Sequence, residues 1–431
     1  MPQTVSTKLQ RIAEQAVQYP EGEFRSLAHL IDPDFLMHAF SRTNPKSSPG
    51  IDGETWKSYA ENLEENLRDL HERMKTMRYR AQPVKRVWLE KEDGKKRPIG
   101  KPVLEDKIVQ RAVTMILEAI YEREFKDVSY GFRPGRSPQG ALQELRKQCM
   151  GKNINWILDA DVSGFFDSID HDLLREAIKK RVNDKSMLRL IGKWLNAGVL
   201  EEGNLHYPGT GTPQGGVISP MLANIFLHYV LDDWFVKEVQ PRMKGKCFLI
   251  RYADDFVIGF EKEEDARKVM EVLPKRFNRF KLTIHPEKTK LIKFGRPVSR
   301  NEVMSENSTF DFLGFTHYWT KSLQEYWVIK RKTAKKRLRR AMDAFWEWCR
   351  HNLHEPIWYQ HQKLSQKLKG YYGYYGIRGN SRMLEVVYDH VQRAWHYWLS
   401  RRCSQGYICW EKFKEFLAKW SLPRPRIVHN I

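Results

Sequence analysis

The sequence predicts an α+β fold in which alternating strands and helices are followed by an all-helical region. Between residues 155 and 318, short apolar runs of strand length alternate with amphipathic segments of helical period, and beyond 318 only the helical pattern continues. With 431 residues, of which 41% are hydrophobic, the chain is long enough for two or three domains with buried cores. We therefore expect domains at 1–150, 151–318 and 319–431.

The charge balance points to a polyanionic partner. Lys and Arg outnumber Asp and Glu by 74 to 53, and residues 296–431 alone hold 25 basic against 11 acidic side chains. Such an excess is the electrostatic footprint of nucleic-acid binding. No apolar stretch approaches about 20 residues and the N-terminus has no apolar signal core, so we expect a cytoplasmic protein without a membrane partner. The five scattered cysteines indicate neither a disulfide framework nor a zinc site.

Two adjacent carboxylates, Asp254 and Asp255, interrupt an apolar run of strand-forming residues at 247–260. Because neighbouring side chains on a strand point to opposite faces, a hairpin that bends at Ala253 and Asp254 is needed to bring both to one edge. Two like charges at that distance require a cation, and hard oxygen ligands suit Mg²⁺. An exposed Asp-Asp turn without chemistry is the alternative.

A second apolar run, at 156–162, also carries acidic residues where burial disfavours them. Asp159 and Asp161 are two residues apart and share one face of the predicted strand, and their spacing does not choose between them. Farther on, Asp170 is expected to cap the helix that begins at His171, and Asp167 is expected to be structural as well.

Two basic loops are candidates for phosphate binding. Arg97 and Lys101 flank a turn before a helix expected at 105–121, where the alternative is a solvated basic hairpin. Arg133 and Arg136 lie in a loop with two glycines that precedes the next helix, and they offer two guanidinium groups to phosphate.

A third loop, at 209–216, contains four glycines and includes Gln214. Its glycines permit the backbone to lie against a flat ligand before a helix that starts at Ser219. In the last third, a basic run at 331–340 is expected to head the first of four helices, and Leu384, Val391 and Trp395 are expected to face the core.

Acidic residues on adjacent strands, basic loops and a glycine-rich platform together indicate phosphoryl transfer at two metal ions. A serine hydrolase is excluded by the missing Gly-x-Ser-x-Gly motif, and the fourteen histidines are too dispersed for a metallohydrolase.

The order of these motifs resembles the reverse transcriptase/maturase encoded by bacterial group II introns. The motifs that carry the resemblance are Ser48-Pro-Gly-Ile-Asp-Gly53, Arg97-Pro-Ile-Gly, Tyr130-Gly-Phe-Arg-Pro-Gly-Arg136, the segment from Thr212 to Asn224, Tyr252-Ala-Asp-Asp255 and Phe312-Leu-Gly-Phe315. The resemblance implies a right-hand polymerase with fingers in residues 1–150, a palm with an antiparallel sheet in 151–318, and a helical thumb/maturase domain in 319–431.

The resemblance also implies roles for individual residues. A Phe-Phe pair four and five residues downstream selects Asp161, which joins Asp254 and Asp255 as ligands of two Mg²⁺ ions, with Mn²⁺ as a substitute and the Val162 carbonyl assisting. The implied nucleotide-binding residues are Phe166, Gln214, Arg97 and Lys101. Among them, Phe166 is the implied steric gate, which excludes a 2′-hydroxyl and so favours dNTPs. Lys288 matches a lysine that protonates the departing pyrophosphate, and a surface ion pair is the alternative.

The implied partners are an RNA template with a DNA primer, dNTPs, intron RNA and a DNA target at the bacterial nucleoid. Besides Arg133 and Arg136, the implied nucleic-acid contacts are Arg331, Lys332, Lys335, Lys336 and Arg339. No Cys-x-x-Cys pair or His-rich cluster of an HNH endonuclease follows residue 423, so we expect no DNA cleavage. Two alternatives stay open: a domesticated enzyme in DNA repair or phage defence, and a maturase that acts mainly as an RNA-binding splicing cofactor.

Overall fold

The computed structural model of this protein describes residues 4–90, 96–201, 204–207, 209–211, 215–297, 308–403 and 406–431. The chain forms two compact units, one of residues 1–137, 158–258 and 263–291, the other of residues 138–157, 259–262 and 292–431. In the part of the chain that the structure describes, no helix has both the length and the apolar content needed to cross a membrane.

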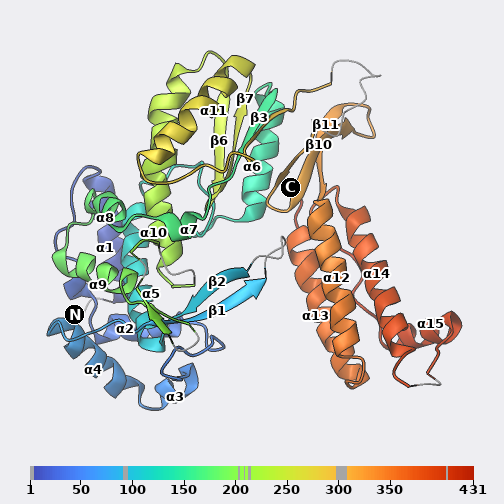
Figure 1. Ribbon diagram of the computed structural model, residues 1–431, viewed down its shortest axis with the longest axis horizontal. Coiled ribbons are helices and arrows are strands. Elements are labelled where there is room, and N and C mark those ends of the chain that lie inside the picture. The colour runs from blue at the N-terminus through green and yellow to red at the C-terminus, as the bar shows by residue number, and fades with distance from the viewer. Residues whose placement is uncertain are drawn as a thin grey trace. The chain divides into compact units, whose positions relative to one another are not determined.

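The first unit begins with short helices that pack around one long buried helix (Figure 1). That helix, α5, is buried along most of its length because apolar residues recur on nearly all of its faces. The helices that precede it are α1 (Val5–Gln18), η1 (Ala28–Leu30), α2 (Pro33–Ser41), α3 (Trp56–Glu61) and α4 (Leu63–Lys75), and α5 itself spans Leu104–Tyr121. α3 and α4 are separated by Asn62.

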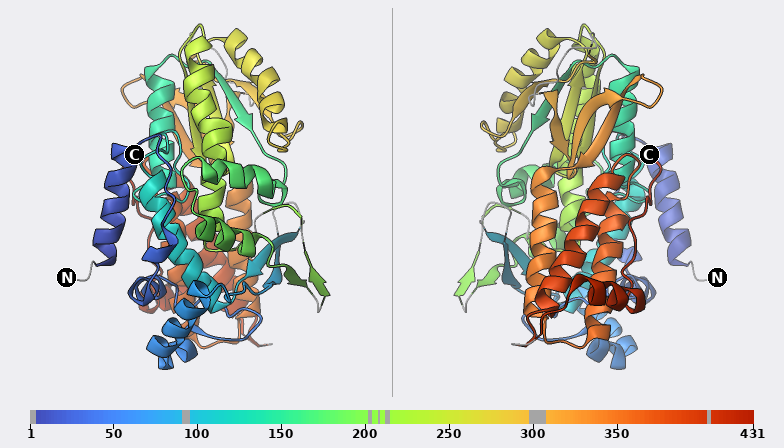
Figure 2. Two further views of the ribbon diagram at one scale, coloured as in Figure 1. Left: turned by 90° about the vertical axis from the view of Figure 1, so that its left-hand side faces the viewer. Right: turned by 90° about the vertical axis from the view of Figure 1, so that its right-hand side faces the viewer.

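A four-stranded sheet of order β2-β1-β4-β5 lies beside these helices (Figure 2). Its strands are β1 (Val84–Glu90), β2 (Lys96–Lys101), β4 (Val199–Glu201) and β5 (Asn204–His206). β1 pairs antiparallel with β2 and parallel with β4. The remaining helices of this unit are α7 (Phe165–Ser168), α8 (His171–Lys179), α9 (Lys185–Leu195), α10 (Ser219–Leu227), the π-helical η2 (His228–Asp232) and η3 (Phe235–Val239), η4 (Gln240–Arg242) and α11 (Glu263–Asn278).

The second sheet, of order β6-β7-β3-β8, contains the acidic runs of the sequence. Its strands are β6 (Cys247–Tyr252), β7 (Asp255–Phe260), β3 (Trp156–Ala160) and β8 (Lys290–Lys293). β6 and most of β7 are buried, in accord with their nearly continuous apolar sequences.

The expected helix cap at Asp170 is confirmed. The Asp170 side chain accepts a hydrogen bond from the Leu173 amide, and α8 begins at the next residue, His171.

The second unit contains α6 (Pro138–Gly151), a three-stranded sheet and four C-terminal helices. The sheet has the order β11-β10-β9, from β9 (Phe310–Phe312), β10 (Phe315–Lys321) and β11 (Trp327–Thr333). The prediction that residues beyond 318 are all helical is therefore wrong for β10 and β11, and Arg331 and Lys332 lie on a strand. Trp327, Ile329 and Arg331 alternate with neighbours on the other face, which is a strand period that the run of basic residues obscured.

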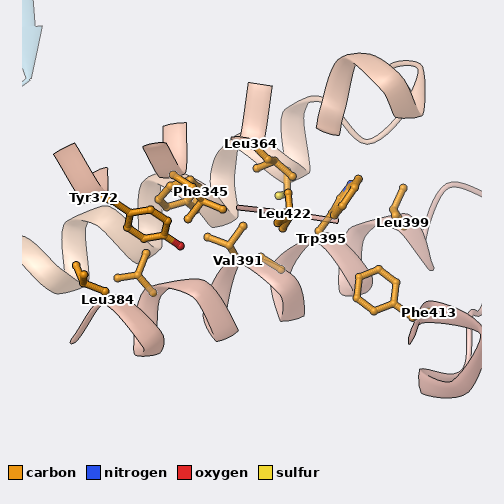
Figure 3. Packing of buried hydrophobic residues seen from close by; sticks show 13 residues of the cluster. Phe345, Leu364, Tyr372, Leu384, Val391, Trp395, Leu399, Phe413 and Leu422 are labelled. Carbon is orange, nitrogen blue, oxygen red and sulfur yellow. The ribbon is translucent and has the colours of Figure 1, made fainter. Parts of the chain in front are cut away.

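The four helices are α12 (Lys335–His351), α13 (Ile357–Tyr375), α14 (Ser381–Leu399) and α15 (Trp410–Lys419). Figure 3 shows their shared core, in which the expected stripe Leu384, Val391 and Trp395 is fully buried. Trp395 also donates its indole N–H to the Gln360 side chain at 2.8 Å, so its polar atom is satisfied inside the core. Tyr372 belongs to the same core.

Candidate active site

The two adjacent aspartates lie at the turn of the β6–β7 hairpin. β6 ends at Tyr252 and β7 begins at Asp255, so the expected bend at Ala253 and Asp254 is confirmed. Ala253 has a φ of 57°, in the left-handed region that residues with a Cβ atom rarely adopt. Backbone of this kind persists only where the surroundings hold it in place.

Asp161 is brought to the same end of the sheet by the pairing of β3 with β7. The amide of Asn155 donates to the carbonyl of Phe260 at 2.9 Å, which places these two residues opposite each other in an antiparallel ladder. Asp161 follows the last residue of β3 and Asp254 precedes the first residue of β7, so the pairing of these strands runs toward both aspartates. Figure 1 shows β6, β7 and β3 side by side.

Val162, the residue after Asp161, forms an antiparallel bridge with Ile284. The flanking hydrogen bonds run from His285 to the Asp161 carbonyl and from Ser163 to the Thr283 carbonyl. Val162 and Ile284 are therefore a non-hydrogen-bonded pair, in which the N–H and C=O groups point away from the partner strand. The Val162 carbonyl accordingly points away from the segment that contains Ile284.

Lys288 donates to the Asp161 carboxylate at 2.9 Å, with side chains that are 62% and 45% exposed. The structure therefore contains the surface ion pair that was one of the two roles considered for Lys288. Water screens a pair at this exposure, so the contact contributes only about 0–1 kcal/mol to stability.

A buried arginine that the sequence interpretation overlooked holds the hairpin in place. Arg251 is fully buried and forms a two-pronged salt bridge with Asp232 at 2.7 and 2.5 Å. The same guanidinium donates to the Asn224 side chain and to the Ala253 carbonyl at 3.0 and 2.9 Å. Arg251 thus connects the turn that carries the aspartates to α10 and η2. An arginine within an apolar strand was the available signal, because such a charge requires a buried acid.

The loop with two arginines packs against the outside of this hairpin. The Tyr130 amide donates to the Arg251 carbonyl at 2.8 Å, and the Asn224 side chain donates to the Gly131 carbonyl at 2.7 Å. A Cβ atom on Gly131 would collide with the backbone nitrogen of Ala253. The glycine of this motif is therefore required for a close approach between two backbone segments.

The glycine-rich loop lies between α7 and β2. A Cβ atom on Gly211 would lie 2.9 Å from the Phe166 carbonyl oxygen, and one on Gly215 would collide with the Gly100 carbonyl oxygen. The Gln110 side chain on α5 accepts hydrogen bonds from the Val217 and Ile218 amides at 2.8 and 3.4 Å. These glycines serve backbone packing, and they bring the loop beside two of the expected nucleotide-binding segments.

The four expected nucleotide-binding residues are described to different degrees. Phe166 is half-buried on α7 and makes an edge contact with Phe165 at 5.3 Å between ring centroids. Lys101 is half-buried at the last position of β2, opposite Lys85. The side chain of Arg97 and the whole of Gln214 lie outside the described residues.

Two of the expected nucleic-acid contacts are corrected by the structure. Arg133 donates to Glu122 and to the carbonyls of Lys126 and Ser129, and its side chain is only 4% exposed, so its hydrogen bonds serve the fold. Arg331 is 2% exposed and donates to the carbonyls of Leu142 and Ile431. Burial and the nearby Arg146 lower the pKa of Arg331 to about 10.

The other expected contacts are on the surface or near it. Arg136 pairs with the exposed Asp127 and stacks over Tyr130, with the guanidinium carbon 5.2 Å from the ring centroid. The remaining residues are all exposed, and they are Lys332, Lys335, Lys336 and Arg339.

The hairpin and the end of β3 offer the kind of ligands that Mg²⁺ prefers, which are carboxylate oxygens and a backbone carbonyl. The contact between Asp161 and Lys288 places a cationic group on one of these carboxylates. Within the described ranges, no three His, Cys, Asp or Glu side chains are grouped closely enough to hold a metal ion. The residues fit the ion by the chemistry of their oxygen ligands.

Comparison with known proteins matches residues 89–317 to a family model described as reverse transcriptase (RNA-dependent DNA polymerase). The group II intron-encoded protein LtrA of Lactococcus lactis subsp. cremoris is 34% identical over 303 residues, covering 67% of this chain and 50% of LtrA. The protein YkfC of Escherichia coli (strain K12) is 32% identical over 327 residues, covering 67% of this chain and 84% of YkfC. A putative COX1/OXI3 intron 1 protein of Saccharomyces cerevisiae is 30% identical over 311 residues, covering 61% of this chain and 37% of that protein.

The chain thus spans about half the length of LtrA. The family match covers both strands of the aspartate hairpin, the β3 strand and the glycine-rich loop. On these findings the chain belongs to the reverse transcriptase family, and within it to the group II intron-encoded reverse transcriptases and maturases.

Proposed function

We propose that this protein is an RNA-directed DNA polymerase that extends a DNA primer on an RNA template and that also binds intron RNA as a splicing maturase. The observation that supports the proposal is the pairing of β3 with β7, because Asp161 directly follows β3 and Asp254 directly precedes β7. Membership of the reverse transcriptase family supplies the reaction class.

In this proposal, Asp161, Asp254 and Asp255 hold two Mg²⁺ ions together with the Val162 carbonyl, and Mn²⁺ is an accepted substitute. Bound there, the ions would activate the primer 3′-hydroxyl and offset the charge that develops on the phosphates. The buried Arg251–Asp232 pair keeps the aspartate turn in position. Lys288, which contacts the Asp161 carboxylate in this structure, would donate a proton to the leaving pyrophosphate.

The incoming dNTP is proposed to bind between β2 and α7. Lys101 and Arg97 would contact its triphosphate, Gln214 its base-pairing region, and Phe166 the 2′ position of its sugar. Support comes from the glycine-rich loop, whose close contacts with Phe166 and Gly100 bring these segments to one place.

The right-hand polymerase architecture is part of the same proposal. Residues 1–150 would be the N-terminal extension and fingers, 151–318 the palm, and 319–431 the thumb/maturase domain. The exposed cations Lys332, Lys335, Lys336 and Arg339 would contact the primer–template duplex or intron RNA.

The proposal is tested by primer extension with dNTPs and Mg²⁺ on an RNA template. Asp254→Asn keeps the size of the side chain but removes its charge, and we expect it to lower the extension rate by roughly 10²–10³-fold, the range seen when one electrostatic interaction with the transition state is removed. The matched control is Asp172→Asn, an exposed acid in the first turn of α8, which should extend like the wild type. Full activity of the Asp254→Asn protein would refute the assignment of the site.

A further inference from the structure

The first unit contains a cavity of about 300 Å³ between α4 and α9. Ile31, Met74, Tyr79 and Leu190 supply an apolar wall. Ile31, Tyr79 and Leu190 are buried, and the ring of Tyr79 is held by hydrogen bonds to Asp106 and Trp194. This volume is at the lower end of the range for small-molecule sites.

The polar part of the cavity wall is basic. Lys75, Arg189 and Lys193 line it together with His29 and His71, and none of its lining residues is acidic. Among the described residues, Lys75, Arg189 and Lys193 form no salt bridge. By contrast, Arg73, two residues before Lys75, pairs with both Asp69 and Glu105.

The partners of these cations are weak or neutral. The Arg189 guanidinium donates to the Met77 sulfur, and the Lys193 ammonium donates to the Tyr79 carbonyl above the ring of that residue. A thioether is a poor acceptor for a guanidinium, so this contact does not compensate the charge. Burial and repulsion by Arg189 and Arg80 lower the pKa of Lys193. The lining of the cavity therefore carries positive charge and no acidic side chain.

A second cavity, of about 550 Å³, adjoins the first and shares Ala28, His29 and Ser186 with it. It adds Lys185 and Arg25, the latter paired with Glu23. The acid in its wall, Asp184, accepts hydrogen bonds from the Leu27, Ala28, Ser186 and Met187 amides at 2.6–3.0 Å. Asp184 is therefore committed to joining η1 to the start of α9, and the basic lining continues past the first cavity.

We propose that the first cavity binds one nucleotide, with its base against the apolar wall and its phosphate at Lys75, Arg189 and Lys193. The apolar wall can contact a flat base, and the cations that lack an acidic partner can bind a phosphate. A nucleotide contains both of these groups. The source is either a nucleotide of a single-stranded RNA segment, turned out of its strand, or a free nucleotide. The RNA source rests on the proposed function, whereas the nucleotide chemistry of the cavity does not.

Binding of two probes to the full-length protein tests this inference. The probes are AMP and a mixed-sequence oligoribonucleotide of twelve residues, measured by thermophoresis in EDTA to suppress metal-dependent binding at the polymerase site. We expect Arg189→Gln/Lys193→Gln to weaken AMP binding at least tenfold. The control Lys268→Gln/Lys275→Gln removes the same charge from exposed positions on α11, and it should change AMP binding less than twofold.

Met74→Trp fills the cavity without changing charge, and it should weaken AMP binding to a similar extent. A parallel loss of oligonucleotide binding in the same variants identifies RNA as the source, and loss of AMP binding alone identifies a free nucleotide. Equal AMP affinities of cavity and control variants would overturn the inference. Primer extension by the same proteins distinguishes this inference from the proposed polymerase function. If the wild-type protein extends no primer, only the polymerase function is contradicted. The cavity variants should extend a primer at the wild-type rate.

Discussion

Single residues set the geometry of the candidate site. Ala253 is held in left-handed backbone, Gly131 permits a neighbouring loop to touch it, and the buried guanidinium of Arg251 binds its carbonyl. Asp254 lies beside this point and directly precedes β7, the strand that pairs with β3. Small changes at these positions should therefore affect chemistry more than stability.

Gly131→Ala is expected to lower both activity and stability, because the new methyl group would collide with the backbone nitrogen of Ala253 and displace the hairpin. We expect a loss of about 1–3 kcal/mol in the free energy of unfolding, as for an overpacked core site. The primer extension rate should fall by more than the stability loss explains.

The matched control is Gly192→Ala in α9, where an added Cβ atom meets nothing within 4 Å. It should stabilise the protein by about 0.5–1 kcal/mol, because alanine favours a helix interior. Urea unfolding and primer extension measure the two effects. Equal behaviour of the two variants would contradict the proposed contact.

Phe166→Ala is expected to relax sugar selection. If the ring of Phe166 occupies the space of a 2′-hydroxyl, its removal should reduce the preference for dNTPs over rNTPs by roughly 10–100-fold, the scale of a steric pocket contact. The measurement is kcat/KM for one dNTP and its rNTP counterpart. Phe166→Tyr keeps the bulk and should retain the wild-type preference, and an unchanged preference in Phe166→Ala would exclude the gate.

At the scale of elements, the site depends on how α5 anchors the strands and loops beside it. Gln110 on this helix binds the amides after the glycine-rich loop, and Asp106 on the same helix binds Tyr79 and the Gln82 amide just before β1. Asp106 is 2% exposed, and burial raises its pKa to about 7. The helix thus carries a carboxyl group that ionises near neutrality.

The raised pKa of Asp106 predicts a pH dependence of stability. An acid whose pKa is higher in the folded state contributes stability that is complete below its unfolded pKa of about 4 and is lost as pH rises through about 7. The Asn side chain of Asp106→Asn cannot ionise. The difference in the free energy of unfolding between the wild type and this variant should therefore shrink between pH 5 and 8, by up to about 3 kcal/mol.

Urea unfolding at several pH values measures this difference. The control is Asp184→Asn, since backbone hydrogen bonds to Leu27, Ala28, Met187 and Ser186 outweigh burial and lower the pKa of Asp184. The stability that ionised Asp184 contributes is lost only as pH falls through this lowered pKa. The free energy of unfolding of Asp184→Asn should therefore differ from that of the wild type by a constant amount between pH 5 and 8. A constant deficit for Asp106→Asn as well would show that Asp106 remains ionised in the folded protein.

At the scale of the whole molecule, the excess of basic residues governs association with nucleic acid. The chain carries a formal net charge of +21, and part of it is committed to structure, as Arg133 and Arg331 show. The cations on β11 and α12 that remain exposed are therefore the ones that can displace counterions from phosphate.

Replacing these exposed cations with alanine should reduce the salt dependence of RNA binding. The variant combines Lys332→Ala, Lys335→Ala, Lys336→Ala and Arg339→Ala. The slope of log K against log salt should fall in magnitude by about 3–4 for a duplex, near 0.9 for each phosphate that is no longer neutralised. The control removes four exposed cations on and beside α11 instead, namely Lys262, Lys268, Lys275 and Arg279, and should change the slope by less than about 1. Equal slopes for the two variants would contradict an interface on β11 and α12.

The sequence by itself determined the local chemistry of this protein. The aspartate hairpin, the Asp170 cap, the core stripe of α14 and the membership of a polymerase family all follow from short-range patterns of apolar, acidic and turn residues. Such features depend on neighbours within a few positions, so the amino-acid order records them directly.

Only the tertiary structure decided which charges are free and which segments meet. Sequence spacing did not distinguish the buried Arg133 and Arg331 from exposed basic residues, because burial depends on partners far along the chain. It also missed Arg251, whose acid lies on η2, and the long strand β11, whose basic residues looked like the start of a helix. The pairing of β3 with β7 joins segments almost a hundred residues apart, and no local pattern specifies such a pairing.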